Sequence, residues 1–106
     1  MSEKFILLAC GSGASSGFMA SSMRKEAKKN GLAIKIKAVS DSEIEEYMDE
    51  IDMLLIGPHI SYLEQELNAL ATAKNVPMAV IPQNIYGRLA GKEALDLALN
   101  VLDKDK

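Results

Sequence analysis

The sequence predicts an open, doubly wound α/β fold: a four-stranded parallel sheet in the order 2-1-3-4 with helices on both faces. Four short apolar runs alternate along the chain with four segments whose apolar residues recur every three or four positions. This alternation indicates βα units joined by right-handed crossovers. The 106 residues suffice for one domain and one sheet. The predicted strands are Phe5–Ala9, Leu32–Val39, Met53–Ile56 and Met78–Ile81.

The character of each apolar run predicts its place in the sheet. Phe5–Ala9 and Met53–Ile56 are continuously apolar, as expected of strands covered by helices on both faces. In the second run, Lys35 and Lys37 alternate with apolar residues, so only one face of that strand is expected to be buried. Lysines also discourage unwanted pairing at a sheet edge. We therefore place the second strand at the edge, beside the first.

Each helical segment carries one apolar face, and turn or capping signals delimit several of them. Asn30-Gly31 predicts the end of the first helix. The segments 40–43 (SDSE) and 61–64 (SYLE) both read as capping boxes and predict two helix starts. The four faces consist of Met19, Met23 and Ala27; of Ile44, Tyr47, Met48 and Ile51; of Leu63, Leu67 and Leu70; and of Leu95, Leu99 and Leu102.

Composition and charge exclude several classes of function. A net charge of −3 argues against a nucleic-acid-binding protein, which would present a basic face. The one cysteine cannot form an internal disulfide, which fits a reducing compartment. No apolar run approaches the roughly 20 residues that a membrane-spanning helix needs, and the first residues do not resemble a signal peptide. The expected location is therefore cytoplasmic.

The predicted strand order places a ligand-binding crevice between strands one and three, where the chain reverses direction. The two bordering loops are Cys10–Gly17 and Gly57–Ser61. A lone cysteine is often a small buried hydrophobic residue. Here, however, Cys10 begins a loop without large side chains, whose backbone N–H groups are free to bind an anion. A helix predicted to start near Ser16 would favour a thiolate, so the pattern indicates covalent phosphoryl chemistry.

Two kinds of phosphoryl chemistry are compatible with a cysteine in such a loop. A cysteine-dependent phosphatase or arsenate-reductase-like enzyme needs an arginine six residues after the cysteine, but Ser16 stands there and the nearest arginine is Arg24. The predicted loop after strand four, Pro82–Gly87, contains no Asp, Glu or His to act as general acid. These absences favour a phosphoryl carrier. A flavodoxin-type binding module without catalysis is the remaining alternative, but the chain has no Trp and only two Phe to stack on a flavin.

Three segments of the chain resemble a known family in order and spacing. LLACGSGASSGFMASSMRKEAKKNG, DMLLIGPHISYL and VIPQNIYGRLAGKEAL are similar to the enzyme IIB component of the lactose/cellobiose/chitobiose branch of the bacterial sugar phosphotransferase system. The resemblance implies that residues 1–106 form a single IIB domain acting as a protein-phosphocysteine–sugar phosphotransferase. Cys10 would accept a phosphoryl group from a phosphohistidine of a IIA protein and pass it to a sugar carried by the membrane-embedded IIC transporter. No metal or other cofactor is implied, and membrane association would come through IIC.

The resemblance also implies roles for residues around Cys10. Backbone amides of the phosphate-binding loop would hold the phosphoryl oxygens, with the Ser15 and Ser16 hydroxyls as further donors. Many family members have a methionine and a hydroxyl residue where this chain has Ala14 and Gly17, so this loop is smaller. The loop comprises Gly11, Ser12, Gly13, Ala14, Ser15, Ser16 and Gly17.

Three further residues are candidates for contact with a partner protein. His59, the only histidine, lies in the second crevice loop, where the family commonly has glutamine. Tyr62 and Tyr86 are expected on the same rim. An exposed loop histidine and half-buried tyrosines at helix starts are the structural alternatives.

Overall fold

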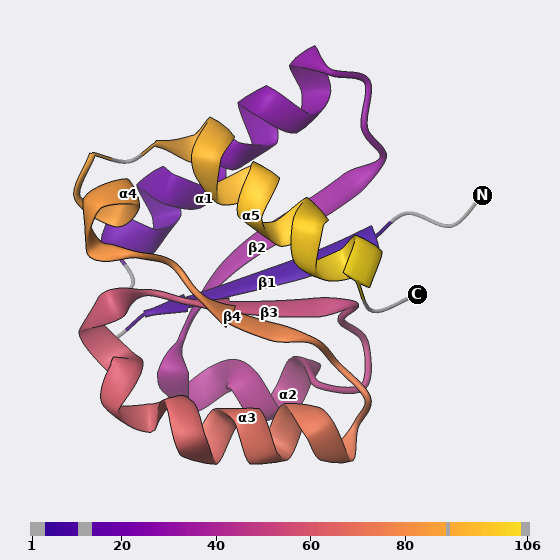
Figure 1. Cartoon of the computed structure of the whole chain (residues 1–106), viewed down its shortest axis with the longest axis vertical. Coiled ribbons are helices and arrows are strands. Elements are labelled where there is room, and N and C mark those ends of the chain that lie inside the picture. Colours follow the sequence, from indigo (N-terminus) through magenta and orange to yellow (C-terminus); the bar gives the residue numbers. More distant parts are fainter. Residues whose placement is uncertain (1–3, 11–13, 89, 105–106) are drawn as a thin grey trace.

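The computed structural model describes residues 4–10, 14–88 and 90–104. Its parallel sheet has the order β2-β1-β3-β4, as predicted (Figure 1). β1 pairs with β2 along its whole length and with β3 through Ile6 to Ala9. The strands are β1 (Lys4–Cys10), β2 (Ile34–Ser40), β3 (Met53–Ile56) and β4 (Met78–Val80).

Helices cover both faces of the sheet. Figure 1 shows α1, α4 and α5 on one face and α2 and α3 on the other, which confirms the doubly wound prediction. The helices are α1 (Ala14–Lys29), α2 (Ile44–Tyr47), α3 (Glu64–Ala73), α4 (Gln83–Gly87) and α5 (Gly91–Lys104). Two 3₁₀ segments, η1 (Asp41–Glu43) and η2 (Pro58–Leu63), precede α2 and α3.

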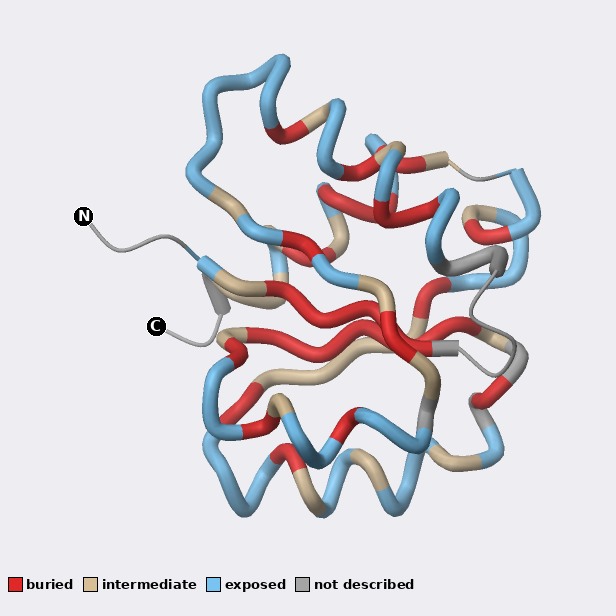
Figure 2. The backbone as a smooth tube through the Cα atoms, turned by 180° about the vertical axis from the view of Figure 1, so that it is seen from behind, coloured by how far each residue is buried: buried red, intermediate tan, exposed pale blue. Residues whose placement is uncertain are grey.

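The sheet separates two hydrophobic cores, and the two central strands contribute to both. Ile6 and Leu8 of β1 pack in the core under α1 and α5, whereas Leu7 and Ala9 pack in the core under α2 and α3. All four residues of β3 are buried. Figure 2 accordingly shows the central strands as the most continuously buried part of the backbone. Opposite-facing side chains on successive residues explain why these strands read as unbroken apolar runs.

The edge position of β2 is also confirmed. Lys35 and Lys37 are exposed, and their ammonium groups lie over the rings of Phe5 (4.7 Å) and Tyr47 (5.5 Å). These lysines therefore cover aromatic surface while their charges keep the strand edge hydrated.

The ends of several helices differ from prediction. α1 begins at Ala14, two residues before the expected start, but its end agrees: Gly31 has φ +67°, and the N–H of Leu32 donates to the Ala27 carbonyl at 2.8 Å. Neither predicted capping box caps its α-helix. The N-cap residues are Glu43 and Leu63, without side-chain caps, because a 3₁₀ turn intervenes in each case.

Two further segments correct the sequence reading. The segment 82–87, expected to be a loop, contains the five-residue helix α4. The second predicted helix is short, because α2 ends at Tyr47 although Met48 and Ile51 of its apolar face are still buried. Both differences concern helices of about one turn, which are too short to show a repeating pattern of apolar residues in the sequence.

Candidate functional site

The candidate site lies at the carboxyl edge of the sheet, where β1 and β3 end beside each other. β1 ends at Cys10, in register with Ser40 of β2. Beyond the end of β3, the N–H of Gly57 donates a 2.9 Å hydrogen bond to the carbonyl of Ala9. The backbone preceding Cys10 is therefore joined to the loop that starts at Gly57. This is the switch point of the sheet, at which open α/β folds bind ligands.

The first turn of α1 follows Cys10 after only three residues. Ala14, Ser15 and Ser16 have helical backbone, and the whole helix is 16 residues long. Its first turn presents backbone N–H groups without intrahelical partners and the positive end of the helix dipole. Such a terminus favours a thiolate or a phosphoryl group nearby. A helix therefore begins within the segment that was predicted to bind an anion.

Several predicted site residues lie outside what the structure describes. Gly11, Ser12 and Gly13 are outside the described residues, as are the side chains of Cys10, Ala14, Ser15, Ser16 and His59. Their proposed roles stay predictions. Gly17 is described: it is exposed, and a Cβ at this position would meet no atom within 4 Å. A side chain at this position would therefore fit.

Arg24 is held away from the start of α1. Its Nε donates a 2.8 Å hydrogen bond to the carbonyl oxygen of Ile36 in β2. Arg24 also lies ten residues beyond Ala14, which corresponds to about 15 Å along the helix axis. This contact gives Arg24 a structural role, because it joins α1 to the edge strand β2.

The two candidate tyrosines differ completely in exposure. Tyr62 in η2 is 77% exposed and accessible to a partner. Tyr86 in α4 is only 3% exposed and belongs to the core under α1 and α5. The expectation that Tyr86 lies on an accessible rim is therefore wrong, because α4 turns its ring inward. Tyr62 keeps its predicted role as a candidate.

Sequence reasoning missed one exposed aromatic residue near the site. Phe18 in the second turn of α1 is 68% exposed. The available signal was its position: Phe18 falls one residue outside the apolar spacing that begins at Met19. A large apolar residue off the buried face of a helix is a candidate for contact with a partner.

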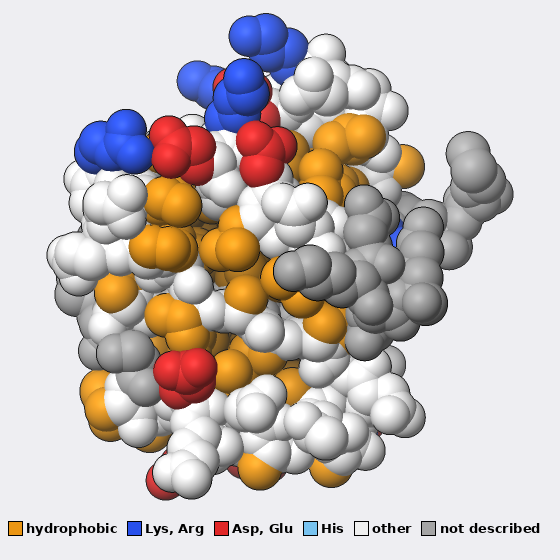
Figure 3. All heavy atoms as spheres, in the orientation of Figure 1, with side chains coloured by type: hydrophobic (Ala, Val, Ile, Leu, Met, Phe, Trp, Pro, Cys, Tyr) orange, Lys and Arg blue, Asp and Glu red, His pale blue; other side chains and the backbone are white. Residues whose placement is uncertain are grey.

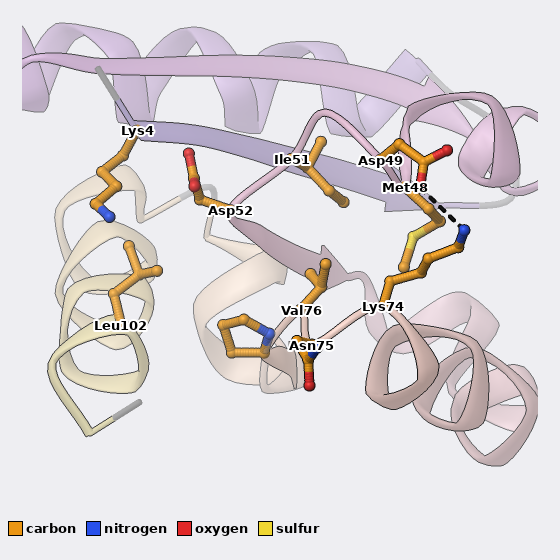
Figure 4. Close-up of a pocket in the computed structure, with 10 residues that line it drawn as sticks. Lys4, Met48, Asp49, Ile51, Asp52, Lys74, Asn75, Val76 and Leu102 are labelled. Carbon is orange, nitrogen blue, oxygen red and sulfur yellow. Dashed lines mark ion pairs between the residues drawn. The ribbon is translucent and has the colours of Figure 1, made fainter. Parts of the chain in front are cut away.

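A well-formed pocket of about 320 Å³ lies at the opposite edge of the sheet (Figure 4). Three of its four charged groups, Asp49, Asp52 and Lys74, are engaged in structural contacts. Lys74 Nζ lies 3.0 Å from Asp49 Oδ1, and Asp52 Oδ2 accepts a 2.8 Å hydrogen bond from the N–H of Phe5. Because these residues surround the amino ends of the strands, the pocket is separate from the candidate site.

In the portion of the chain that the structure describes, no three His, Cys, Asp or Glu side chains form a group able to hold a metal ion. Over the same residues, no helix combines the length and apolar character required to cross a bilayer.

Comparison with known proteins gives a consistent result. Residues 5–97 match the family described as PTS system, Lactose/Cellobiose specific IIB subunit. An oligo-β-mannoside-specific EIIB component from Bacillus subtilis (strain 168) is 37% identical over 99 residues, covering 93% of this chain and 96% of that protein.

Two solved structures are similar in fold. The cellobiose-specific phosphotransferase IIB component from Borrelia burgdorferi is 27% identical, with a TM-score of 0.82 over 99% of this chain and 96% of that one. The lactose-specific IIB component domain from Streptococcus pneumoniae has a TM-score of 0.86 over 94% of this chain and 98% of that one. At 16% identity, this second likeness concerns the fold alone.

Proposed function

Because the chain belongs to the family of lactose/cellobiose-specific IIB subunits of the sugar phosphotransferase system, we propose that Cys10 carries a phosphoryl group from a IIA protein to a sugar. The observation that carries this proposal is the position of Cys10 at the end of β1, beside the Gly57 loop and three residues before α1. The Bacillus subtilis relative is an oligo-β-mannoside-specific EIIB component by name, which supports a sugar as the final acceptor.

The proposed chemistry consists of two displacements at phosphorus. In the first, the Cys10 thiolate attacks the phosphorus of a phosphohistidine on IIA, the P–N bond breaks and the imidazole leaves. In the second, a sugar hydroxyl held by the IIC transporter attacks the same phosphorus, its proton is lost, the S–P bond breaks and the thiolate is restored. Positioning and charge stabilisation account for most of such catalysis.

The residues 11–17 supply that stabilisation in the proposal. Their backbone N–H groups and the amino end of α1 would donate hydrogen bonds to the phosphoryl oxygens, where negative charge is concentrated. The hydroxyls of Ser15 and Ser16 are additional donors. The reaction needs no metal or nucleotide, because the phosphohistidine already carries an activated group.

A hydrolytic enzyme is the less favoured alternative. A phosphatase would need an arginine on the phosphoryl group, and Arg24, the first arginine after Cys10, is bonded to the Ile36 carbonyl instead.

The chain is also proposed to act in the cytoplasm and to reach the membrane only by binding IIC. The identity of the sugar would then be set by IIC.

Phosphoryl transfer from purified, radiolabelled phospho-IIA tests the proposal directly. The wild-type chain should take up one label, and Cys10→Ser should take up none, because a serine hydroxyl is rarely ionised near neutral pH. Far-UV circular dichroism checks that the variant keeps its fold. If the serine variant accepted label at the wild-type rate, Cys10 would not be the carrier.

A further inference from the structure

Charge is distributed very unevenly along the chain. Residues 38–73 contain nine acidic residues and no Lys or Arg, whereas the remaining residues contain twelve basic and six acidic residues. The segment 38–73 includes η1, α2, η2 and α3, which together cover one face of the sheet. Figure 3 shows Lys and Arg side chains gathered at the top, towards α1, and none is visible along the bottom, where α3 lies.

An apolar groove opens on this acidic face, between the start of α2 and α3. It has a volume of about 340 Å³. Ile44, Leu63, Leu67 and Leu70 supply its apolar lining, and the three leucines are only partly buried. Glu45 and Glu66, both exposed, line the groove from the two helices. Apolar surface bordered by acidic side chains is suited to a segment that combines apolar and basic residues.

The groove begins close to the carboxyl edge of the sheet. Ser42, which also lines it, stands two residues after Ser40, the register partner of Cys10. At the other side of the groove, Leu63 directly follows the exposed ring of Tyr62. A segment bound in the groove would therefore approach Cys10 along η1 and η2 without covering α1.

We propose that this groove binds a basic, amphipathic cytoplasmic loop of the IIC transporter while Cys10 donates its phosphoryl group. The inference rests on the proposed function, in which IIC is the membrane partner. Cytoplasmic loops of membrane proteins carry an excess of Lys and Arg, so their charge is complementary to this face. Docking on α2 and α3 would leave α1, which covers the opposite face of the sheet, uncovered.

Two separately measured transfer steps test the groove. The first step is phosphorylation of the chain by purified phospho-IIA in solution. The second is sugar phosphorylation by the phosphorylated chain, using inside-out membrane vesicles that contain the IIC transporter. We compare Glu45→Lys/Glu66→Lys with the matched control Glu50→Lys/Asp96→Lys, which makes the same change in net charge at exposed positions outside the groove.

The groove variant should raise the concentration of phosphorylated chain needed for half-maximal sugar phosphorylation about tenfold, and it should weaken the dependence of that step on salt. Its first step and both steps of the control should stay within about twofold of wild type. Glu45→Gln/Glu66→Gln is a second groove variant, for use if the lysine substitutions disturb the fold. It should raise the same half-maximal concentration by a smaller factor.

Three results would overturn the inference. The first is an unchanged second step in both groove variants. The second is an equal loss of activity in the IIA step, which would make the groove a IIA site. The third is an equal loss of activity in the control variant, which would reduce the effect to net charge. If wild-type chain transferred no phosphoryl group in either step, the proposed function itself would fail, and this outcome is distinct from the other three.

Discussion

At the scale of single residues, Arg24 illustrates how one contact distinguishes a structural role from a catalytic one. It is the first arginine after Cys10, so a phosphatase-like mechanism would have to use it or a more distant one. Its Nε is instead bonded at 2.8 Å to the Ile36 carbonyl, which joins α1 to the edge strand β2. A charge-assisted hydrogen bond of this kind contributes to stability and lies far from the start of the helix.

We therefore expect Arg24→Gln to lower the free energy of unfolding by about 1 kcal/mol and to leave phosphoryl uptake from phospho-IIA unchanged. Lys25→Gln, a neighbouring exposed position with the same change in charge, serves as control and should alter neither quantity appreciably. Urea unfolding measures the stability and label uptake measures the reaction. A large loss of phosphoryl uptake in a folded Arg24→Gln chain would show that this arginine takes part in the reaction.

The two tyrosines show what sequence patterns cannot resolve at this scale. Tyr62 and Tyr86 both lie six residues beyond the end of a strand, in short helical segments of six and five residues. Yet one is 77% exposed and the other 3% exposed. In so short a helix no repeat reveals which side faces the core. Exposure there is decided by how α4 packs beside α5, which is a tertiary property.

At the scale of elements, the packing of α1 against α5 depends on a missing side chain. Gly91, the first residue of α5, is buried against Ser22 of α1. A Cβ at position 91 would clash with Ser22 Oγ and would lie 2.6 Å from the backbone carbonyl carbon of Ser22. Because a backbone atom is involved, rotation of a side chain cannot relieve the overlap. The two helices would have to separate.

Gly91→Ala should therefore destabilise the chain by about 1–3 kcal/mol. Gly87→Ala is the matched control, because a Cβ at position 87, the last residue of α4, meets nothing within 4 Å. That control should be neutral or slightly stabilising. Thermal or urea unfolding distinguishes the two variants. Equal stability of both would show that α1 and α5 do not approach each other so closely.

The amino end of α1 leads to a prediction for the reactivity of Cys10. We expect the pKa of the Cys10 thiol to lie below its ordinary value, because the amino end of α1 and the backbone amides proposed to form the anion-binding loop both favour negative charge. Bound phosphate would bring like charge to the thiolate and raise that pKa again. Alkylation by iodoacetamide should consequently remain fast at mildly acidic pH and should slow when phosphate is added.

The measurement is the pH profile of alkylation with and without phosphate, and chloride at equal ionic strength controls for screening. An ordinary thiol pKa alone would leave phosphoryl transfer possible, because IIA can align the reacting groups. An ordinary pKa together with no protection by phosphate would contradict the proposed anion-binding loop.

The predictability of each element follows its length and burial. The long helix α1 and its end at Asn30-Gly31 were readable, because 16 residues show a repeat and Gly31 adopts the positive φ that favours glycine. The capping boxes predicted the starts of α2 and α3 too early, because a 3₁₀ segment precedes each of these helices. In the first case Ser40 Oγ contacts the carboxylate of Glu43 at 3.2 Å. A local motif thus formed a local contact without setting the helix start.

At the scale of the whole molecule, the sheet order was predictable because each strand signals its environment. β3 is buried throughout, whereas β2 alternates lysines with apolar residues, and these two patterns suffice to assign centre and edge. The candidate site follows from that order, because it fixes which loops meet. The apolar groove on the acidic face was not anticipated, because it depends on how far α2 and α3 stand apart over Ile44 and Leu67.

The arrangement of the whole chain also bears on the lifetime of the phosphorylated form. A carrier must keep its phosphoryl group away from water until the acceptor arrives, whereas a phosphatase assists water. Here the arginine nearest to Cys10 in the sequence is bonded to β2, and residues 82–87, which follow β4, contain no Asp, Glu or His. Hydrolysis would thus lack both the arginine and the general acid that a cysteine-dependent phosphatase uses.

We therefore expect the phosphocysteine to persist far longer than a single catalytic cycle once phospho-IIA is removed. Label on the chain and free inorganic phosphate are followed over time after the donor has been separated by gel filtration. Adding unphosphorylated IIA should discharge the label rapidly, because the transfer is reversible and an imidazole is a better-placed acceptor than water. This discharge also serves as the control that the adduct is competent. Release of inorganic phosphate at the turnover rate of a phosphatase, without any acceptor, would instead identify a hydrolytic enzyme.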